Sequence, residues 1–156
     1  MVVRQRLEER IGEVIREVRF PIEAGKIVEF ARAMKDDGKV YADAVAARSA
    51  GYAAIPAPLT FSVASAHYAG GDATELPRRL GLDLSRTVHG EQRWVYHHPV
   101  VAGTVLHGVT RIAQVDRKQG RGGEMLRVLT ETQYRDEEGK LVVEEYMLTI
   151  ELPADK

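Results

Sequence analysis

The second half of the chain constrains the fold most, because from Val88 onward it consists of strand-like segments separated by turn residues. Four such segments follow one another, namely VHGEQRWVYHH, TVLHGVTRIAQV, MLRVLTETQY and KLVVEEYMLTIEL. The stretches that join them, PVVAG, DRKQGRGG and RDEEGK, each contain Gly or Pro, which are typical of turns. Consecutive strands joined in this way predict an antiparallel meander.

Alternation of apolar and polar residues predicts which faces of the last two strands are buried. In the last strand one face carries Val142, Tyr146, Leu148, Ile150 and Leu152, and in the strand before it one face carries Leu126, Val128, Thr130, Thr132 and Tyr134. These faces need an apolar partner. The segment FSVASAHYA, at 61–69, is rich in small residues and nearly uncharged, and it is predicted to form a helix buried on most sides.

The first half of the chain supplies one more strand and the remaining helices. Residues 13–20 alternate as a short strand, residues 24–34 place apolar side chains at helical spacing, and residues 42–50 form a second helix that ends at Gly51. The two prolines of IPAPLTF impose an extended path before the central helix. Residues 70–87 are predicted to be a loop with one turn of helix. The whole pattern predicts an α+β fold in which the sheet wraps around one central helix.

Composition limits the size of the fold and the range of its partners. With 156 residues, of which 44% are apolar and 29% charged, the chain is long enough for a single domain. Its formal net charge of −1 provides no overall field that would attract nucleic acid or an anionic membrane. Because no apolar run reaches the length of a membrane span and the first residues lack a signal-peptide core, a cytoplasmic location is expected. The absence of cysteine excludes disulfides, thiolate metal sites and a cysteine nucleophile.

Two motifs carry a resemblance to a known family. They are A-x-x-x-G-Y-x-x-I-P-A-P-L-T-F, at 47–61, and H-G-E-Q-R-W-x-Y-x-x-P-V-x-A-G-T-V-L, at 89–106. In its order of elements and in these motifs the chain resembles the MaoC-like hotdog proteins. More closely, it is similar to the N-terminal-type MaoC dehydratase domain of accessory subunits in bacterial (3R)-hydroxyacyl-thioester dehydratases. The resemblance implies one hotdog domain over residues 1–156, with its core at about 8–152, and an antiparallel sheet around a central helix.

Catalytically complete hydratases of the wider family carry an Asp and a His in the pattern Gly-Asp-x-Asn-Pro-Leu-His-x-Asp. Laid on this chain, the pattern falls on KDDGKVYAD, where Asp36 takes the place of the Asp, Tyr41 that of the His and Asp43 that of the closing acid. Hydration of a trans-2-enoyl thioester needs one group that activates water at C3 and another that handles the proton at C2. The phenol of a tyrosine titrates near pH 10, which makes Tyr41 a poor general base.

The resemblance therefore implies an accessory, substrate-binding subunit of a (3R)-hydroxyacyl-thioester dehydratase or enoyl-thioester hydratase. It implies an acyl-CoA or acyl-carrier-protein thioester as ligand, with neither a metal nor a cofactor. The thioester is expected where the chain leads into the central helix, at Pro56, Pro58, Thr60 and Phe61, with helix N–H groups as donors to its oxygen. A dimer is expected because an exposed edge strand needs a partner, either a second copy or a catalytic MaoC-like subunit.

Each candidate residue also has a plain structural interpretation. Asp36, in the stretch KDDGK, is typical of a turn that ends a helix. Tyr41 is typical of a half-buried packing residue, and the prolines are typical of a rigid turn. His89, a further catalytic candidate, either points into a pocket or lies on the surface of its strand. His97 and His98 have no third ligand at useful spacing, which argues against a metal site.

Three other functions stay open. The first is a self-sufficient homodimeric enoyl-CoA hydratase in which His89 or another histidine replaces the missing one. The second is a non-catalytic module that binds an acyl group. The third is a hotdog thioesterase, which is disfavoured because residues 59–69 contain no Asp or Glu to activate water. The basic stretch from Arg117 to Gly123 is either a contact for a phosphopantetheine or an acidic carrier protein, or a solvated hairpin loop.

Overall fold

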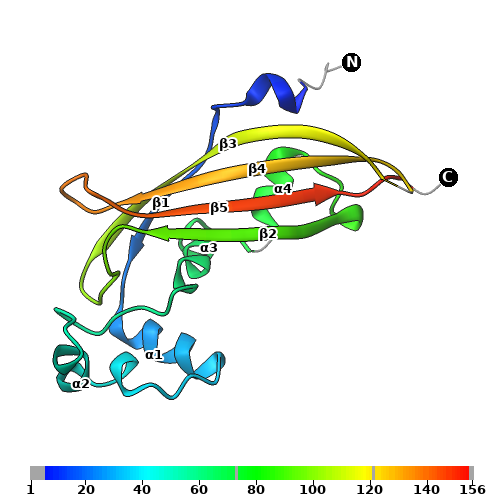
Figure 1. The fold of residues 1–156 in the computed structure, drawn as a ribbon. Helices are drawn as coiled ribbons and strands as arrows, with labels where there is room; N and C mark the ends of the chain where they lie inside the picture. The colour runs from blue at the N-terminus through cyan, green and yellow to red at the C-terminus, as the bar shows by residue number, and fades with distance from the viewer. Residues whose placement is uncertain (1–5, 73, 121, 155–156) are drawn as a thin grey trace.

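One five-stranded antiparallel sheet, in the order β1-β3-β4-β5-β2, dominates the computed structural model, which describes residues 6–72, 74–120 and 122–154. The strands are β1 (Val14–Pro21), β2 (Thr87–Tyr96), β3 (Val105–Gly120), β4 (Gly123–Arg135) and β5 (Leu141–Glu151). The sheet curves over a short central helix (Figure 1). The predicted α+β arrangement, a sheet wrapped around a helix, is confirmed.

The helices are short. They are α1 (Ala24–Ala33), α2 (Ala44–Ser49), α3 (Ser65–Tyr68) and α4 (Glu75–Leu80), with 3₁₀ turns η1 (Leu7–Arg10), η2 (Lys39–Tyr41), η3 (Phe61–Ala64) and η4 (Leu84–Arg86). Figure 1 shows α3 beneath the curved sheet and α1 with α2 beyond it, away from the strands. Among the helices of the described residues, none combines the length and apolar character that crossing a lipid bilayer requires.

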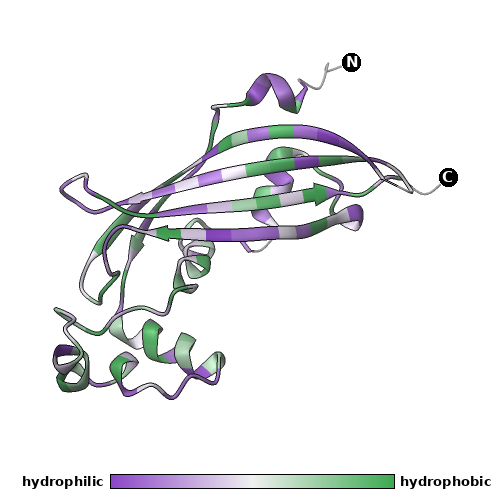
Figure 2. Ribbon diagram, viewed as in Figure 1, coloured by the Kyte–Doolittle hydropathy of each residue, from purple (hydrophilic) through white to green (hydrophobic). Residues whose placement is uncertain are grey.

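The concave face of the sheet buries two apolar clusters. The first surrounds η3 and contains Val18, Phe20, Ile22, Ile27, Phe61, Leu106, Tyr134, Val142 and Val143. The second lies under α4 and contains Ile15, Leu76, Leu80, Leu82, Ile112, Val115 and Val128. Figure 2 shows hydrophobic and hydrophilic residues alternating along the strands, as expected for a sheet with one buried and one exposed face.

The predicted four-strand meander is wrong, because only β3, β4 and β5 follow one another in the sheet. Strand β1 pairs with β3 from Val14 to Pro21 and occupies the edge that β2 would need. Strand β2 therefore pairs with β5 at the opposite edge. The connection at 97–104 crosses back to β3 and is held by hydrogen bonds, from the Ala102 N–H to the Ile55 carbonyl at 2.8 Å and from the Gly103 N–H to the Ile22 carbonyl at 2.9 Å.

The predicted buried face is right for β4 and wrong for β5 except at Val142, which is buried as expected. Val128, Thr130, Thr132 and Tyr134 of β4 are buried as expected. Their partners across the ladder are Thr149, Met147, Glu145 and Val143, so the odd-numbered residues of β5 share the buried face. Tyr146, Leu148 and Ile150 consequently lie on the convex face. Two of the inward positions are polar, and for that reason the apolar periodicity of β5 indicated the wrong face.

The central helix and the last hairpin also differ from expectation. The segment FSVASAHYA forms the 3₁₀ turn η3 followed by the four-residue helix α3, and Val63, His67 and Tyr68 are exposed, so this segment is not buried on most sides. The predicted loop from Arg117 to Gly123 is instead mostly strand, because β3 continues to Gly120 and β4 begins at Gly123. Residue 121, in the middle of that prediction, lies outside the described residues.

Candidate functional site

Asp36 closes the turn that follows α1. Its Oδ1 accepts a hydrogen bond from the Gly38 N–H at 3.0 Å, and its own N–H donates to the Ala31 carbonyl at 2.9 Å. A Cβ on Gly38 would lie 3.0 Å from Asp36 Oδ1 and 3.2 Å from the Tyr41 ring, so any larger residue there would have to displace these side chains slightly. The carboxylate of Asp36 is exposed and already engaged with backbone. It has the geometry of a turn residue.

Tyr41, the residue expected at the place of the family histidine, ends η2 and is half-buried. Burial, assisted by the negative charge of Asp36 and by Tyr52, raises the pKa of the Tyr41 phenol above its ordinary value. The phenol therefore stays protonated at neutral pH and can donate a hydrogen bond, whereas it cannot serve as a base. Asp43 accepts from the Val45 N–H at 2.7 Å and caps α2.

A pocket of about 370 Å³ opens beside Tyr41. It is lined by Tyr41, Tyr52, Pro56, Ala57, Leu59, Tyr96, His97, His98, Pro99 and Val100. The Tyr96 hydroxyl donates to the Leu59 carbonyl, and burial together with the charge of Glu145 raises the pKa of Tyr96 to about 12. His97 Nε2 lies 2.7 Å from Glu144 Oε2, which fixes this ring at the rim.

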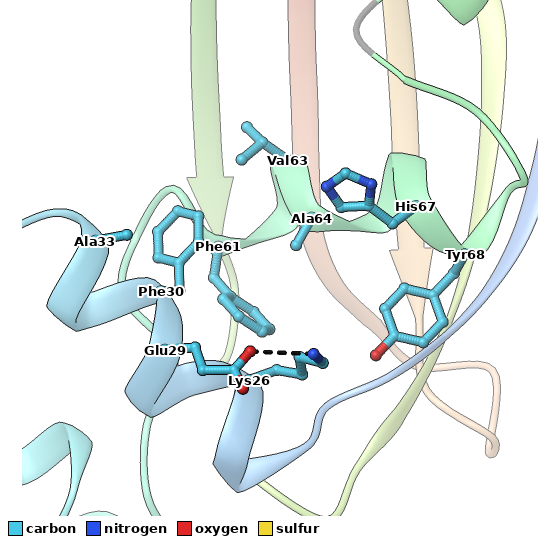
Figure 3. Close-up of a pocket in the computed structure, with 9 residues that line it drawn as sticks. All are labelled: Lys26, Glu29, Phe30, Ala33, Phe61, Val63, Ala64, His67 and Tyr68. Carbon is cyan, nitrogen blue, oxygen red and sulfur yellow. Dashed lines mark hydrogen bonds and ion pairs between the residues drawn. The ribbon is translucent and has the colours of Figure 1, made fainter.

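A larger groove of about 610 Å³ runs between α1 and the central helical segment (Figure 3). It is lined by Lys26, Glu29, Phe30, Ala33, Phe61, Val63, Ala64, His67 and Tyr68. Its floor is aromatic, because Phe61 packs edge-on against Phe30 with ring centroids 5.3 Å apart and stacks on Phe20 at 5.5 Å. An ion pair of 3.0 Å between Lys26 and Glu29 lies at the rim. An apolar groove with a charged rim suits an aliphatic chain with a polar head.

A small enclosed cavity lies behind Phe61 and borders both of the larger spaces. Its walls are Phe20, Ala57, Pro58, Phe61, Ser62, Tyr96, Val100, Leu106, Tyr134 and Val143. It shares Phe61 with the groove and Tyr96 with the pocket beside Tyr41. With a volume of about 10 Å³ this cavity has room for at most one water molecule, so the side chains around Phe61 and Tyr96 pack closely between the two larger spaces.

The predicted substrate-binding residues are distributed over these spaces. Pro56 lies in the pocket beside Tyr41, Pro58 in the enclosed cavity and Phe61 in the floor of the groove. The Thr60 hydroxyl donates to Met34 Sδ at 3.6 Å. The expected backbone donors are partly engaged, since the N–H groups of Phe61 and Val63 donate to the Pro58 and Thr60 carbonyls at 2.9 and 3.2 Å.

Of the predicted catalytic residues, Asp36 and Tyr41 are brought together and His89 is not. His89 is exposed near the start of β2 and pairs with Thr149, whereas the pocket beside Tyr41 lies at the other end of that strand, at Tyr96. Among the described residues no group of three metal-ligating side chains forms. Sequence reasoning missed His98 as a pocket residue, and its only signal was the His-His-Pro stretch that follows β2.

A curved antiparallel sheet around a short helix, with an apolar groove beside that helix, defines a hotdog fold, which a solved MaoC-like dehydratase shares. The chain belongs to the family described as FAS1-like, dehydratase domain region, which matches residues 9–145. A UPF0336 protein of Streptomyces avermitilis is 42% identical over 125 residues, which are 79% of this chain and 80% of that one.

Two solved structures show the same fold. One is a chain of the HadBC (3R-hydroxyacyl-ACP dehydratase) complex from Mycobacterium tuberculosis, with a TM-score of 0.70 and 32% identity over 87% of this chain and 96% of that chain. The other is a MaoC-like dehydratase with a TM-score of 0.78 and 24% identity, of which this chain covers 44%. Membership of a dehydratase-domain family and similarity to HadBC support a hydratase-like role.

Proposed function

We propose that this chain is the acyl-binding subunit of a (3R)-hydroxyacyl-thioester dehydratase or enoyl-thioester hydratase, and that a second MaoC-like subunit supplies the catalytic Asp and His. The observation that carries the proposal is the loop at 35–43. Tyr41, with a raised pKa, stands where the resemblance places the histidine, and Asp36 is bonded to backbone. This loop contains no histidine, so it cannot form the Asp/His pair that shares proton transfer near neutral pH.

The spaces around the central helical segment support the acyl-binding half of the proposal. Hydration adds a hydroxide to C3 and a proton to C2 of the enoyl thioester, and dehydration removes both. In the proposal this chain holds the aliphatic part of the substrate in the groove floored by Phe30 and Phe61. The Tyr41 phenol, being protonated, donates a hydrogen bond at the mouth of the pocket. Lys26 at the rim suits the anionic head of an acyl-CoA or an acyl carrier protein.

The HadBC relative supports the two-subunit half of the proposal. That protein is described as a (3R)-hydroxyacyl-ACP dehydratase complex, and the similarity covers nearly the whole of one of its chains. By analogy, this chain pairs with a similar-sized subunit whose loop carries both the Asp and the His. In this arrangement each subunit provides what the other lacks.

The test is reconstitution. The purified chain alone is expected not to hydrate crotonyl-CoA or a longer enoyl-CoA, and activity is expected to appear when a MaoC-like subunit with the Asp and the His, encoded in the same organism, is added. The loss of the enoyl absorbance reports the rate. Brisk turnover by the chain alone contradicts the proposal. If the chain binds acyl-CoA but activates no such subunit, the proposal is also wrong, and the function that remains is a non-catalytic module that binds an acyl group.

One observation favours a second candidate, the self-sufficient hydratase. His98 lines the same pocket as Tyr41, so a histidine is available at this mouth from a different part of the chain. If the second candidate is right, the chain alone is active, and His98→Gln abolishes that activity while His89→Gln, at the far end of β2, preserves it. Under the leading proposal neither variant changes the activity of the isolated chain, because it has none.

A further inference from the structure

The inward face of β2 carries two aromatic side chains that donate hydrogen bonds into the interior. Trp94 and Tyr96 lie two positions apart, on the same face of the strand, and both are half-buried. Arg93 points the other way, because its guanidinium lies over the Tyr146 ring on the convex face, 4.5 Å from the ring centroid. Since β2 is the strand at one edge of the sheet, these two donors connect that edge to the segment beneath it.

Both donors bind residues 59–62, which we call the entry segment. The Trp94 indole N–H donates to Ser62 Oγ at 2.8 Å, and the Tyr96 hydroxyl donates to the Leu59 carbonyl. Ser62 is buried, with 8% of its surface exposed. An indole has a single N–H, and here Ser62 is its acceptor. This bond therefore ties the second end of the entry segment to the sheet, as the Tyr96 bond ties the first.

The backbone of the entry segment has little other attachment to the sheet. The Ala57 N–H donates to the Val100 carbonyl at 2.8 Å. In the part of the chain that the structure describes, no later backbone hydrogen bond joins residues 58–69 to a strand. The N–H groups of Phe61 and Val63 donate to carbonyls of their own stretch instead. The side-chain bonds from β2 therefore provide the polar attachment of the entry segment to the sheet.

The entry segment carries Phe61, whose ring forms the floor of the groove of about 610 Å³ (Figure 3). Ser62 is the next residue in the chain, yet neither Ser62 nor Trp94 lines the groove. Trp94 packs against the first apolar cluster, to which Phe61 belongs. It is therefore placed to act on a ligand in the groove through the entry segment, without touching that ligand. Tyr96 differs, because it lines the pocket beside Tyr41.

We propose that Trp94 is a positioning residue for the acyl chain, because its hydrogen bond to Ser62 holds the entry segment where the Phe61 ring forms the groove floor. The inference rests on the proposed acyl-binding function and adds to it a residue outside the groove. Without this bond the entry segment has more conformations available, and a smaller fraction of molecules has the floor formed. The apparent dissociation constant for a ligand that needs the floor rises by the inverse of that fraction.

The test measures the binding of octanoyl-CoA and of acetyl-CoA to the full chain by isothermal titration calorimetry. Ser62→Ala removes the acceptor and leaves the indole in place. Its dissociation constant for octanoyl-CoA is expected to rise roughly fivefold, the factor that corresponds to one ordinary hydrogen bond. The value for acetyl-CoA is expected to stay at that of the wild type, because two carbons make little use of the floor. Trp94→Phe removes the donor and is expected to show the same selectivity for the longer chain.

Ser65→Ala is the matched control. The Ser65 hydroxyl is also buried and lies 2.9 Å from the Tyr134 hydroxyl of β4, but Ser65 belongs to α3 and does not line the groove. The change therefore removes a buried serine hydroxyl bonded to the sheet without releasing the entry segment. This control is expected to keep the wild-type affinity for octanoyl-CoA. If Trp94→Phe does not fold, Ser62→Ala against Ser65→Ala gives the comparison.

A double-mutant cycle checks whether the effect passes through Phe61. Phe61→Leu removes the aromatic floor, so the further change Ser62→Ala is expected to alter the octanoyl-CoA affinity by less than about twofold in that background. If Ser62→Ala weakens binding as much there as it does in the wild type, Ser62 acts by another route. The positioning role of Trp94 is then wrong.

The outcomes separate the inference from the function on which it rests. If no acyl-CoA binds the wild type, the proposed function and the positioning role both fall. If the wild type binds octanoyl-CoA and a folded Ser62→Ala variant binds it equally well, acyl binding stands and the positioning role is wrong. An equal loss for octanoyl-CoA and acetyl-CoA, or an equal loss in Ser65→Ala, also contradicts the positioning role, because either result is a general effect on the fold.

Discussion

At the scale of single residues, the protonation of buried tyrosines is tied to stability. Burial, together with the charge of Glu145, raises the pKa of the Tyr134 phenol far above its ordinary value of about 10. The folded state therefore keeps this proton at a pH where the unfolded chain has released it. Above about pH 10 the unfolded state binds fewer protons than the folded state, so the free energy of unfolding falls as pH rises.

Tyr134→Phe is expected to weaken this alkaline loss of stability. A tyrosine that stays protonated in the folded state lowers the free energy of unfolding by about 1.4 kcal/mol for each pH unit above its pKa in the unfolded chain. Urea unfolding of the wild type and the variant between about pH 8 and pH 11 checks this, and the two are expected to differ in slope only above pH 10. Equal slopes throughout that range would show that Tyr134 ionises in the folded protein.

At the scale of elements, one glycine lies in close contact with neighbouring side chains and another lies in open space. Gly108 of β3 faces Tyr134 across the ladder, and a Cβ there would lie 2.7 Å from the Tyr134 ring and 2.9 Å from Val18. Gly25, in the first turn of α1, has no such neighbour within 4 Å. The sheet needs a glycine at 108 so that the tyrosine ring can lie over the neighbouring strand, whereas the helix has no such need at 25.

Gly108→Ala is expected to lower the free energy of unfolding by about 1–3 kcal/mol, because the new methyl group displaces Tyr134 or Val18. Gly25→Ala, the matched control, is expected to raise it by about 0.5–1 kcal/mol, because alanine favours the helix and meets nothing. Denaturant unfolding of both variants provides the comparison. Equal effects of the two changes would mean that the close approach at Gly108 does not constrain the sheet.

Local sequence patterns predicted the elements whose buried side chains are apolar. They failed where the buried side chains are polar. The helical spacing at 24–34 and the alternation at 126–134 correspond to α1 and the inward face of β4. In β5 the inward Glu145 and Thr149 are polar and the outward Leu148 and Ile150 apolar, so alternation indicated the opposite face. The position of β2 beside β5 depends on β1 taking the other edge, which is a long-range competition that no local pattern records.

The candidate site was predictable to a similar degree. The turn geometry of Asp36 follows from the short stretch KDDGKVYAD, and the same stretch carries the expectation that Tyr41 stands at the histidine position. The approach of His98 to Tyr41 does not follow from this stretch, because it arises from the crossing connection at 97–104. The roles of Asp36, Tyr41 and the residues around Pro56 in binding stay predictions.

At the scale of the whole molecule, apolar side chains gather around the central helical segment. Leu59, Val63 and Tyr68 are exposed there, and Met34 of α1 lies beside Thr60. Strand β2 forms the free edge of the sheet beyond β5. A free edge together with exposed apolar side chains is characteristic of a surface that another chain covers. Under the proposed function, that chain is the catalytic MaoC-like subunit.

Val63→Asp is expected to prevent assembly with the catalytic subunit without unfolding the chain. Val63 is 42% exposed in the isolated chain, so the charge is solvated there, but it would be buried without a partner in the complex. The dissociation constant of the complex is expected to rise by at least about tenfold, because each 1.4 kcal/mol that burial of the unpaired charge costs raises it by a factor of ten.

Ile11→Asp is the control, because Ile11 is equally apolar and 51% exposed but precedes β1, outside the residues that line the groove. Co-purification and sedimentation of both variants distinguish the outcomes, and equal assembly by the two would place the partner elsewhere on the molecule.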